Sequence, residues 1–414
     1  MYWWSYPSKV TLFVLLPVYV SCCAIGSEGF RLYGHYTKFI DFNVFLVGLT
    51  GLLVFGFSSW LLEGKGDRPA NLDRINPVVL GRALLAMFCL SVAGYVMFFL
   101  PLLGRPSLIP ELAFGSNSAQ FQIRALLTVD KLHGTSLMSL QMYVAILYGL
   151  WRQLSDKPPT RSARIQFYVL LVMCLLRAWL NSERLAAIEL VLPFALVRYA
   201  GIQNRKSVAL VFAPLFGVVA VYFLFSVGEY FRSWQFYRAF GGTFVEFSWA
   251  RLVGYYATAL NNGAAAITRL PPNVWPLRTF PFLFKLPFWN ALGLPNPLES
   301  DQWMTFLALY ANPEFNNPSG IFSPVSDFGL VLGIGTWALM GVIAGSLFRA
   351  YYRWKLVGLI LYPAFYIGIA EVLRIFYWGL DRTFLPIVGG FLLVFYLNAR
   401  RPSAWSEALA AENG

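Results

Sequence analysis

Two clusters of charged residues flank short reversals between apolar segments, and their residue types could do chemistry. Each cluster holds two arginines and two carboxylates: Arg177, Glu183, Arg184 and Glu189 in the first, and Glu371, Arg374, Asp381 and Arg382 in the second. Guanidinium groups bind phosphate oxygens bidentately and stay charged at any relevant pH. We therefore expect these arginines, together with Arg251 from the intervening segment, to bind an anionic diphosphate group of a lipid.

A second interpretation of the same residues remains open. Each arginine could pair with a neighbouring carboxylate, Glu183 or Asp381, and anchor the end of a helix. Sequence alone does not distinguish an ion pair that stabilises a fold from one that stands at a binding site.

The composition is that of a polytopic membrane protein. Of the 414 residues, 58% are hydrophobic and 13% are charged, with a mean hydropathy of +0.58. A soluble domain carries about 25% charged residues, so a water-soluble or disordered chain is excluded. In a soluble protein the net charge of +12 would suggest nucleic acid. Here the basic residues lie in short loops, which indicates membrane lipid and no nucleic acid as the partner.

A helix needs about 20 apolar residues to cross a bilayer, and this rule predicts about ten transmembrane helices. The segments are 10–26, 42–62, 79–103, 134–150, 165–180, 185–200, 207–227, 328–348, 356–372 and 383–399. We therefore expect an all-α fold with three parts: residues 1–227 with seven helices, a large loop at 228–327, and residues 328–414 with three helices and a tail.

Charge predicts the orientation of these helices. The short segments around Arg152–Arg164, Arg198–Lys206 and Arg349–Lys355 are basic, as is the segment after residue 399. The positive-inside rule places them in the cytoplasm. Both termini are then cytoplasmic, and the two charged clusters and the large loop lie on the external side of the membrane.

The large loop holds ten of the 24 prolines of the chain and so is expected to be mostly irregular. Two amphipathic helices are predicted within it, at 244–267 and 301–311, lying at the membrane interface. In the first, Arg251, Tyr255, Thr258 and Asn262 share one face. The middle of the bilayer is nearly free of charge, whereas a transporter places ionisable groups there. The pattern therefore favours a site at the outer membrane boundary.

Other signals are weak. His35 and His133 are the only histidines, and Glu299-Ser300-Asp301 is an acid-x-acid triplet of the kind that can hold a divalent metal. The four cysteines lie in apolar stretches, so they indicate neither disulfides nor a metal site. The sequence contains no nucleotide-binding P-loop, and we predict neither a cofactor nor a metal.

Several short stretches resemble bacterial O-antigen polymerases, also called oligosaccharide repeat unit polymerases. They are Arg177 to Ala186 with Asn-Ser-Glu-Arg at 181–184, the segment from Tyr255-Tyr256 to Asn261-Asn262, Asn316 to Phe322, and Asp327-Phe328-Gly329. The resemblance extends over about 165–350. It implies a multi-pass glycosyltransferase of the C type in the bacterial inner membrane.

Enzymes of that family take part in the biosynthesis of lipopolysaccharide and other surface polysaccharides. They join repeat units carried on undecaprenyl diphosphate, at the periplasmic face and without a metal. The growing chain is the donor, and the incoming unit supplies the attacking hydroxyl.

The resemblance suggests roles for the residues singled out above. Arginines placed in advance stabilise the charge that develops on the leaving diphosphate, with Arg184 first, then Arg374 and Arg382, and Arg251 and Arg177 in support. Asp327, Glu183 and Asp381 are the candidates for the base, with Asp327 preferred because a paired Glu183 would be a poor base. Tyr255, Tyr256 and Asn262 would hold sugar hydroxyls.

Two rival functions remain. An O-antigen ligase differs in its acceptor, which no residue reports, and a lipid-linked glycan flippase would need a charged central cavity. The sequence also leaves open the sugar repeat, the linkage and its stereochemistry, the oligomeric state, and whether the protein works beside a polysaccharide chain-length regulator.

Overall fold

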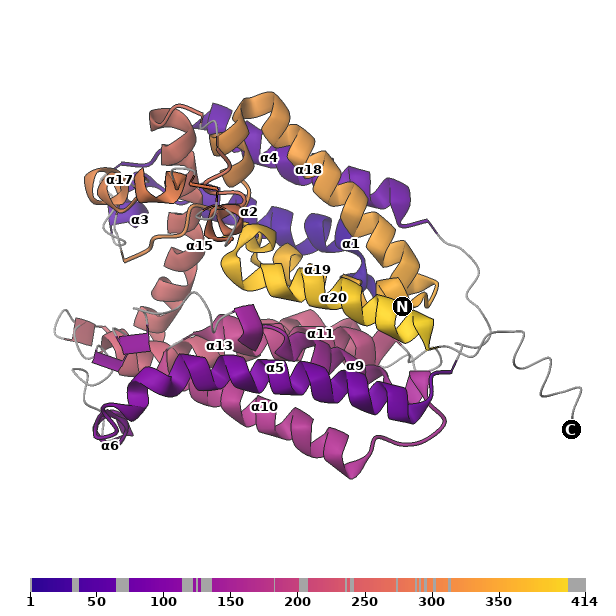
Figure 1. The fold of residues 1–414 in the computed structure, drawn as a ribbon. Helices are drawn as coiled ribbons and strands as arrows, with labels where there is room; N and C mark the ends of the chain where they lie inside the picture. Colours follow the sequence, from indigo (N-terminus) through magenta and orange to yellow (C-terminus); the bar gives the residue numbers. More distant parts are fainter. Residues whose placement is uncertain are drawn as a thin grey trace, which may run out of the picture.

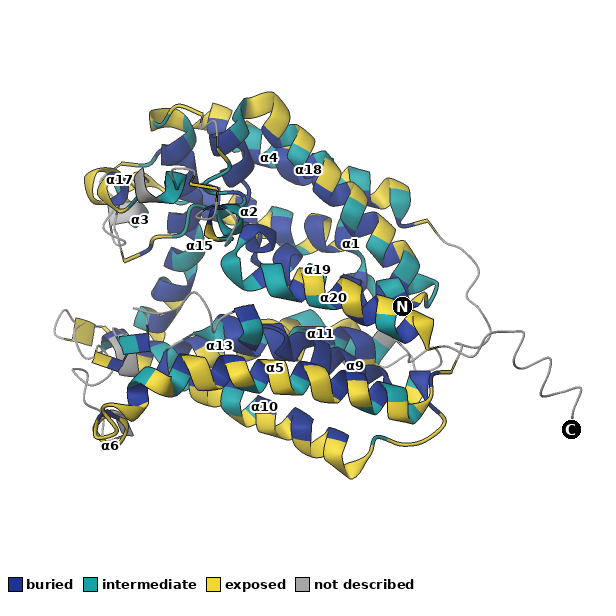
Figure 2. Cartoon of the chain, viewed as in Figure 1, coloured by how far each residue is buried: buried dark blue, intermediate teal, exposed yellow. Residues whose placement is uncertain are grey.

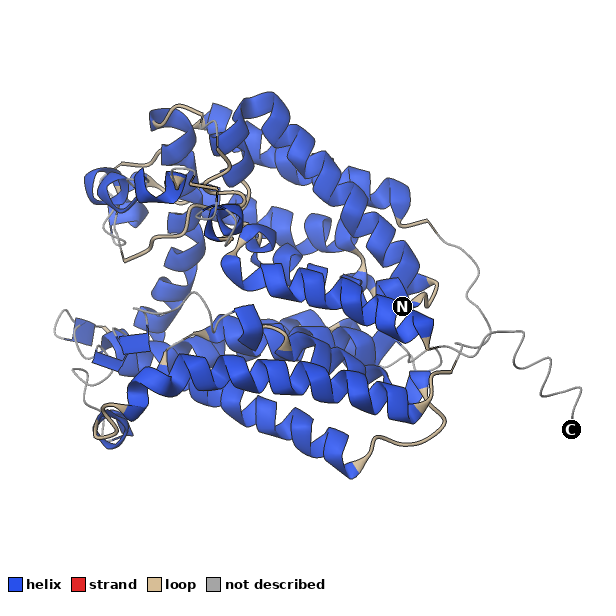
Figure 3. Cartoon of the chain, in the orientation of Figure 1, coloured by secondary structure: helices blue, strands red, loops and turns tan. Residues whose placement is uncertain are grey.

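All regular structure that the computed structural model describes is helical (Figure 3). The described residues are 2–31, 37–64, 74–113, 122–123, 126–127, 136–181, 183–200, 208–234, 237–238, 242–272, 275–286, 289, 292–293, 296–300, 303–311 and 314–400. No strand occurs within these ranges. The all-α prediction is therefore confirmed for this part of the chain. His35, His133 and Asp301 lie outside it.

The helices follow one another along the whole described chain. The longer ones are the continuous run of α1 (Pro7–Val10), η2 (Thr11–Leu15) and α2 (Leu16–Cys23), then α4 (Phe42–Leu62), α5 (Pro77–Leu103), α9 (Gln141–Leu154), α10 (Arg161–Leu180), α11 (Arg184–Ala200), α13 (Ala213–Glu229), α15 (Phe244–Arg269), α18 (Ser323–Tyr352), α19 (Leu356–Glu371) and α20 (Asp381–Ala399). The short ones are η1 (Trp3–Ser5), α3 (Ser27–Arg31), α6 (Leu108–Ala113), α12 (Val208–Val211), η3 (Tyr230–Trp234), η5 (Pro281–Lys285), η6 (Pro297–Ser300), α17 (Trp303–Tyr310) and η7 (Tyr377–Gly379).

Five helices of the described chain are long and apolar enough to cross a membrane: α4, α5, α10, α18 and α20. Pro7–Cys23, α13 and α19 are apolar but shorter. Each of the ten segments expected from the sequence overlaps a helix of the structure. The fourth is displaced, because α9 covers Gln141–Leu154 where 134–150 was expected.

The short helix α9 lies in the interior of the bundle. All but four of its 14 residues are buried apolar side chains or glycine, and it contacts α5, α10, α11 and α19. A helix of this length spans about 21 Å, less than the ~30 Å hydrocarbon core. Because neighbouring helices enclose α9, its side chains contact protein on the faces where a lipid-exposed helix would contact lipid.

The long helices form two groups that run roughly alongside one another (Figure 1). One group contains α5, α9, α10, α11 and α13, and the other contains α1, α2, α4 and α18. Helix α19 joins the groups by packing against α9 and α11 on one side and against α18 and α20 on the other. The N-terminus and the end of α20 lie at the same end of the bundle, opposite α15 and α17 (Figure 1).

Helices α4 and α18 pack closely through glycine. A Cβ built on Gly341 would lie 2.5 Å from the carbonyl oxygen of Phe55, and one on Gly345 would lie 2.4 Å from that of Ser59. Small residues let membrane helices approach until their backbones touch. The glycine-rich stretch of α18 is thus used for helix packing. Nearer its start, α18 is kinked at Gly329, which has φ 75°.

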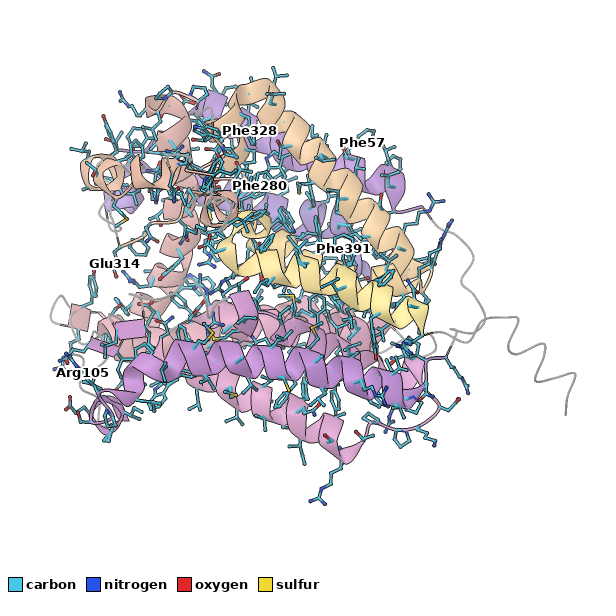
Figure 4. The ribbon with its side chains drawn as sticks, viewed as in Figure 1. Phe57, Arg105, Phe280, Glu314, Phe328 and Phe391 are labelled. Atoms are coloured by element: carbon cyan, nitrogen blue, oxygen red, sulfur yellow. The ribbon has the colours of Figure 1, made fainter. Side chains whose placement is uncertain are left out.

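The outer surface of the long helices is apolar, as expected of a chain dissolved in lipid. Exposed residues follow the outward faces of α5, α10 and α18 (Figure 2). Large hydrophobic side chains make up much of this surface: Phe57 of α4 and Phe391 of α20 are each 59% exposed (Figure 4). Exposed apolar area on this scale would aggregate in water, so it supports the membrane assignment.

Helix α15 crosses the end of the bundle and bridges the two groups. It contacts α13 of the first group and α2 and α18 of the second. A capping box starts it, in which Thr243 and Glu246 satisfy each other's backbone N–H groups. The predicted helix at 244–267 is confirmed, and α17 confirms the shorter one at 301–311. The predicted interfacial position is wrong for the second half of α15, because residues 257–266 are buried on all sides.

The packing of α4 on α18 yields a stability prediction. Replacing Gly341 by Leu forces the two backbones apart and should lower the free energy of unfolding by about 1–3 kcal/mol. Gly335→Leu in the same helix is the matched control, since a Cβ there meets nothing within 4 Å. Thermal unfolding in detergent measures both, and equal midpoints for the two variants would contradict this packing.

Candidate functional site

The two charged hairpin tips of the sequence meet in the structure. Arg382, at the start of α20, is ion-paired with Glu183 of the α10–α11 tip and lies 3.2 Å from Glu189 of α11. Tyr377, in the α19–α20 connection, donates a hydrogen bond of 2.9 Å to the same Glu189. These contacts join the two hairpins directly.

Arg177 belongs to the same network. Its Nε and Nη2 atoms lie 2.9–3.0 Å from the carboxylate of Glu183, and its side chain is fully buried. Asn181 also donates to Glu183, at 3.1 Å. Both oxygens of this carboxylate are thus committed to groups of the protein. The ion-pair interpretation holds for Arg177 and Arg382, and their charges are balanced by Glu183 and Glu189.

This arrangement makes Glu183 a weak base. Burial raises the pKa of its carboxyl, but the guanidinium groups of Arg177 and Arg382 outweigh burial and hold the pKa far below the usual range. The sequence led us to expect that an ion pair would depress this pKa. The partners that lower the pKa are these two arginines, which form the ion pairs with Glu183.

Arg184 differs from these two arginines. Its guanidinium lies between the rings of Tyr255 in α15 and Phe225 in α13, 4.6 and 5.0 Å from their centroids. The Nη2 atom is buried and has no hydrogen-bond partner among the described residues. A buried donor without a partner costs free energy. Arg184 is therefore held in place by rings, which leaves the donors of its Nη2 for another group.

The N-terminus of α11 adds partial positive charge beside Arg184. Arg184 is the first residue of α11, and the first turn of that helix carries no acidic residue. The N-terminus of a helix has a partial positive charge, which disfavours a cation and attracts an anion. A residue placed against this preference is expected at functional sites. Charge and helix end together favour an anionic ligand.

Arg374 and Tyr256 complete this part of the site. Arg374 follows α19 and pairs with Glu371 through Nε and Nη2, both 2.7 Å from Oε2. Burial and the carboxylate of Glu371 raise the pKa of Tyr256 above its ordinary value, and the charges of Arg184 and Arg374 oppose that rise. These groups hold two positive charges against one negative charge. The site therefore has a positive charge available for a ligand.

Arg251 is not free to bind a ligand. Its Nε lies 3.2 Å from Glu229 at the end of α13, and its Nη2 is ion-paired with Glu314. Its side chain is 7% exposed, and its guanidinium faces the ring of Phe315 at 4.5 Å. Two carboxylates balance its charge, so the structure does not support direct binding of a diphosphate by Arg251.

Asp327 has a structural role that argues against it as the general base. Its Oδ2 accepts hydrogen bonds of 2.7–2.9 Å from the backbone N–H groups of Arg278 and Thr279 and from the Thr279 hydroxyl. The side chain is fully buried. Three donors on one oxygen tie the 276–280 segment to α18. A substrate hydroxyl would have to displace them.

Asp381 is the most accessible of the three candidate bases. Its side chain is 28% exposed and is ion-paired with Lys285 of η5. Because it precedes Arg382 in the chain, it stands at the joined tips. The assignment of Asp381 as the general base stays a prediction, and the geometry permits it.

The structure places the three predicted sugar-binding residues in different environments. Asn262 is fully buried and donates its two amide hydrogens to the carbonyl oxygens of Phe315 and Asn317, at 2.5 and 3.1 Å. It therefore binds the loop exit through its amide nitrogen, whereas its Oδ1 is buried without a hydrogen-bond partner among the described residues. Its assignment to a sugar stays a prediction. Tyr255 holds Arg184, as described above. Tyr256 stays a candidate for contact with substrate.

The motif at 316–322 is explained by packing. A Cβ on Gly263 of α15 would lie 2.6 Å from the carbonyl oxygen of Pro318, and one on Gly320 would lie 2.4 Å from that of Val372. Ser319 has φ 62°. The segment is pressed between α15 and the end of α19. It therefore fixes α15 relative to the second tip.

Sequence reasoning gave no role to several residues of the site. Glu189 and Glu371 were noticed as charges near membrane spans, which is a signal for function, but their partners could not be predicted. Phe225, Glu229 and Glu314 gave no signal, because a phenylalanine and two isolated glutamates are ordinary in such a sequence. Within the described residues, no group of three His, Cys, Asp or Glu could hold a metal ion.

Comparison with known proteins returns no relatives. The chain matches no family model, no curated protein and no solved structure. The site is therefore interpreted from its own geometry.

The Glu183 network yields a prediction about stability and pH. Glu183→Gln leaves buried Arg177 without its counter-charge and should cost about 3–5 kcal/mol at pH 7. The folded-state pKa of Glu183 is depressed, so the stabilisation is complete above the unfolded value of about 4.3 and is lost as the pH falls below it. The difference between variant and wild type should be equal at pH 7 and 5 and smaller at pH 3.

Thermal unfolding in detergent at these three pH values measures the effect. Asp381→Asn is the matched control, since the Lys285 pair is partly exposed and should contribute no more than about 1 kcal/mol. A Glu183→Gln effect as small as that of the control would contradict the account of the network.

Proposed function

We propose that this chain is an inner-membrane glycosyltransferase that polymerises oligosaccharide repeat units carried on undecaprenyl diphosphate. The product would be an O-antigen or a similar surface polysaccharide. The observation that carries the proposal is Arg184, a guanidinium fixed between two rings with a buried nitrogen that has no partner within the described chain. A diphosphate offers the negative charge and the acceptor oxygens that such a group lacks.

The proposal includes ten membrane crossings in a C-type arrangement. In it, α9, α11, α13, α19 and Pro7–Cys23 cross together with the five longer helices. Burial supports this for α9, since a helix enclosed by protein need not match the lipid in length or composition. Basic residues at the end opposite α15, among them Arg161 and Arg349, support a cytoplasmic position for that end. The site would then face the periplasm.

In the proposed reaction, the bond between the anomeric carbon of the growing chain and its diphosphate breaks. A hydroxyl oxygen of the incoming unit forms the new glycosidic bond, its proton passes to a base, and undecaprenyl diphosphate leaves. Negative charge develops on the leaving oxygen. Arg184 and Arg374, with the N-terminus of α11, would stabilise that charge because they are positioned before the reaction begins.

The geometry refines which groups would take part. Asp381 takes the role of base, since Glu183 is held by two arginines and Asp327 by three hydrogen-bond donors. Arg177 and Arg382 would position Arg184 through the Glu183 network. Tyr256, whose pKa reflects the nearby charges of Arg184 and Arg374, would contact the diphosphate or the first sugar.

Removal of the guanidinium tests the proposal. Arg184→Ala should lower the rate by about 100-fold or more, as expected when a preorganised charge donor is lost, so that cells dependent on this variant make no long polymer. The readout is the length distribution of surface polysaccharide on a gel, with protein level and membrane insertion measured in parallel. Arg105→Ala, an exposed arginine at the same end of the molecule (Figure 4), is the matched control. Full-length polymer in the Arg184→Ala strain would refute the diphosphate role.

A further inference from the structure

Arg251 and Arg184 are connected through aromatic rings. Arg251 faces the ring of Phe315 at 4.5 Å. Phe315 meets Tyr255 edge-on, with centroids 5.4 Å apart, and Tyr255 carries Arg184 at 4.6 Å. Each contact is an attractive geometry between a cation and a ring or between two rings. The position of Arg251 is thereby transmitted to the ring on which Arg184 rests.

The contacts that connect Arg251 with Arg184 form two layers between α13 and α15. Arg251 and Tyr255 are one turn apart in α15, and Glu229 and Phe225 are one turn apart in α13. The ion pair of Arg251 with Glu229 forms one layer. The edge-on contact of Tyr255 with Phe225, at 5.4 Å, forms the next. Arg184 is held by the two rings of the second layer.

Glu314 anchors the arrangement from the other side. Its carboxylate is ion-paired with Arg251 and lies 3.3 Å from the Tyr237 hydroxyl. Glu314 precedes Phe315, so the ion pair also places that ring over the guanidinium. Glu314 lies at the α15 end of the molecule (Figure 4), and its side chain is 39% exposed. The exposed carboxylate of Glu314 thus fixes the Arg251 guanidinium and the Phe315 ring that lies over it.

We propose that Arg251 is a positioning residue: with Glu229 and Glu314 it sets the spacing of α13 and α15 and so holds Tyr255 and Phe225 against Arg184. This inference rests on the proposed function, in which Arg184 binds the substrate diphosphate. Arg251 itself does not touch the diphosphate. Its contribution is to restrict Arg184 to the orientation that binds, which lowers the ordering cost of binding.

The Glu314→Gln variant separates this role from direct binding by the sign of its effect. If Arg251 bound the diphosphate directly, removal of a competing carboxylate would strengthen anion binding. If Arg251 positions Arg184, removal of the same carboxylate loosens Phe315 and Tyr255 and weakens anion binding. The change leaves the second carboxylate of Arg251, Glu229, in place, so the buried guanidinium keeps a counter-charge.

The experiment uses the full-length chain in nanodiscs of neutral phosphatidylcholine, with inorganic pyrophosphate as the probe and calorimetry as the measurement. Arg184→Ala should lower the affinity about tenfold or more, the loss expected for one charge-assisted contact. Glu314→Gln and Phe315→Leu should each lower it about three- to tenfold. Glu111→Gln, an exposed glutamate of α6, is the matched control and should leave it unchanged.

A double variant completes the test. In the Arg184→Ala background, Glu314→Gln should change the residual affinity no further, because the effect passes through Arg184. A further loss equal to that of the single variant, or a gain or no change in affinity for Glu314→Gln alone, overturns the positioning role. Wild-type affinity in Arg184→Ala, or no binding by the wild type, refutes the proposed function itself, so the two failures are distinguishable.

Discussion

The structure depends on one constraint: a guanidinium group enclosed by protein must find a counter-charge or a partner. Glu183 meets this need for two arginines at once, one from each hairpin. That shared carboxylate joins the α10–α11 tip to the α19–α20 tip, and Glu189 with Tyr377 strengthens the same junction. Breaking a buried pair exposes its full desolvation cost, so the junction is fixed. Arg184, next in sequence to Glu183, is thereby held at a defined place.

The remaining elements bring other groups to that place. Helix α15 spans the two halves of the bundle and supplies Tyr255 on one face of Arg184, while Phe225 of α13 supplies the opposite face. The loop exit at 316–322 is locked to α15 by Asn262 and by the absence of a side chain at Gly263. A rigid surround matters because a charged group accelerates a reaction when its orientation precedes the reaction. The apolar exterior of the long helices is typical of a membrane protein.

The sequence predicted the elements better than their contacts. Apolar runs located helices near every expected segment, and the amphipathic pattern over 244–267 predicted α15 almost to its ends, since periodicity is a local signal. The start of α9 was misplaced because an enclosed helix loses the contrast between lipid and water faces. The sequence singled out the arginines of the site by their residue type and by their position near the ends of the apolar segments. It did not reveal their partners, because the choice between Glu183 serving Arg177 and serving Arg184 is made by tertiary packing, and the same holds for Asp327 and Asn262.

Reconstitution tests the central claim most directly, namely that this site transfers glycan chains between lipid-linked diphosphates. Purified protein in liposomes would receive the undecaprenyl-diphosphate-linked repeat unit of its host in the presence of a chelator, and the products would be separated by size. The account predicts a ladder of products longer than the input. An intact substrate without a ladder, with folded protein in the membrane, would contradict it and favour a ligase without its acceptor or a flippase.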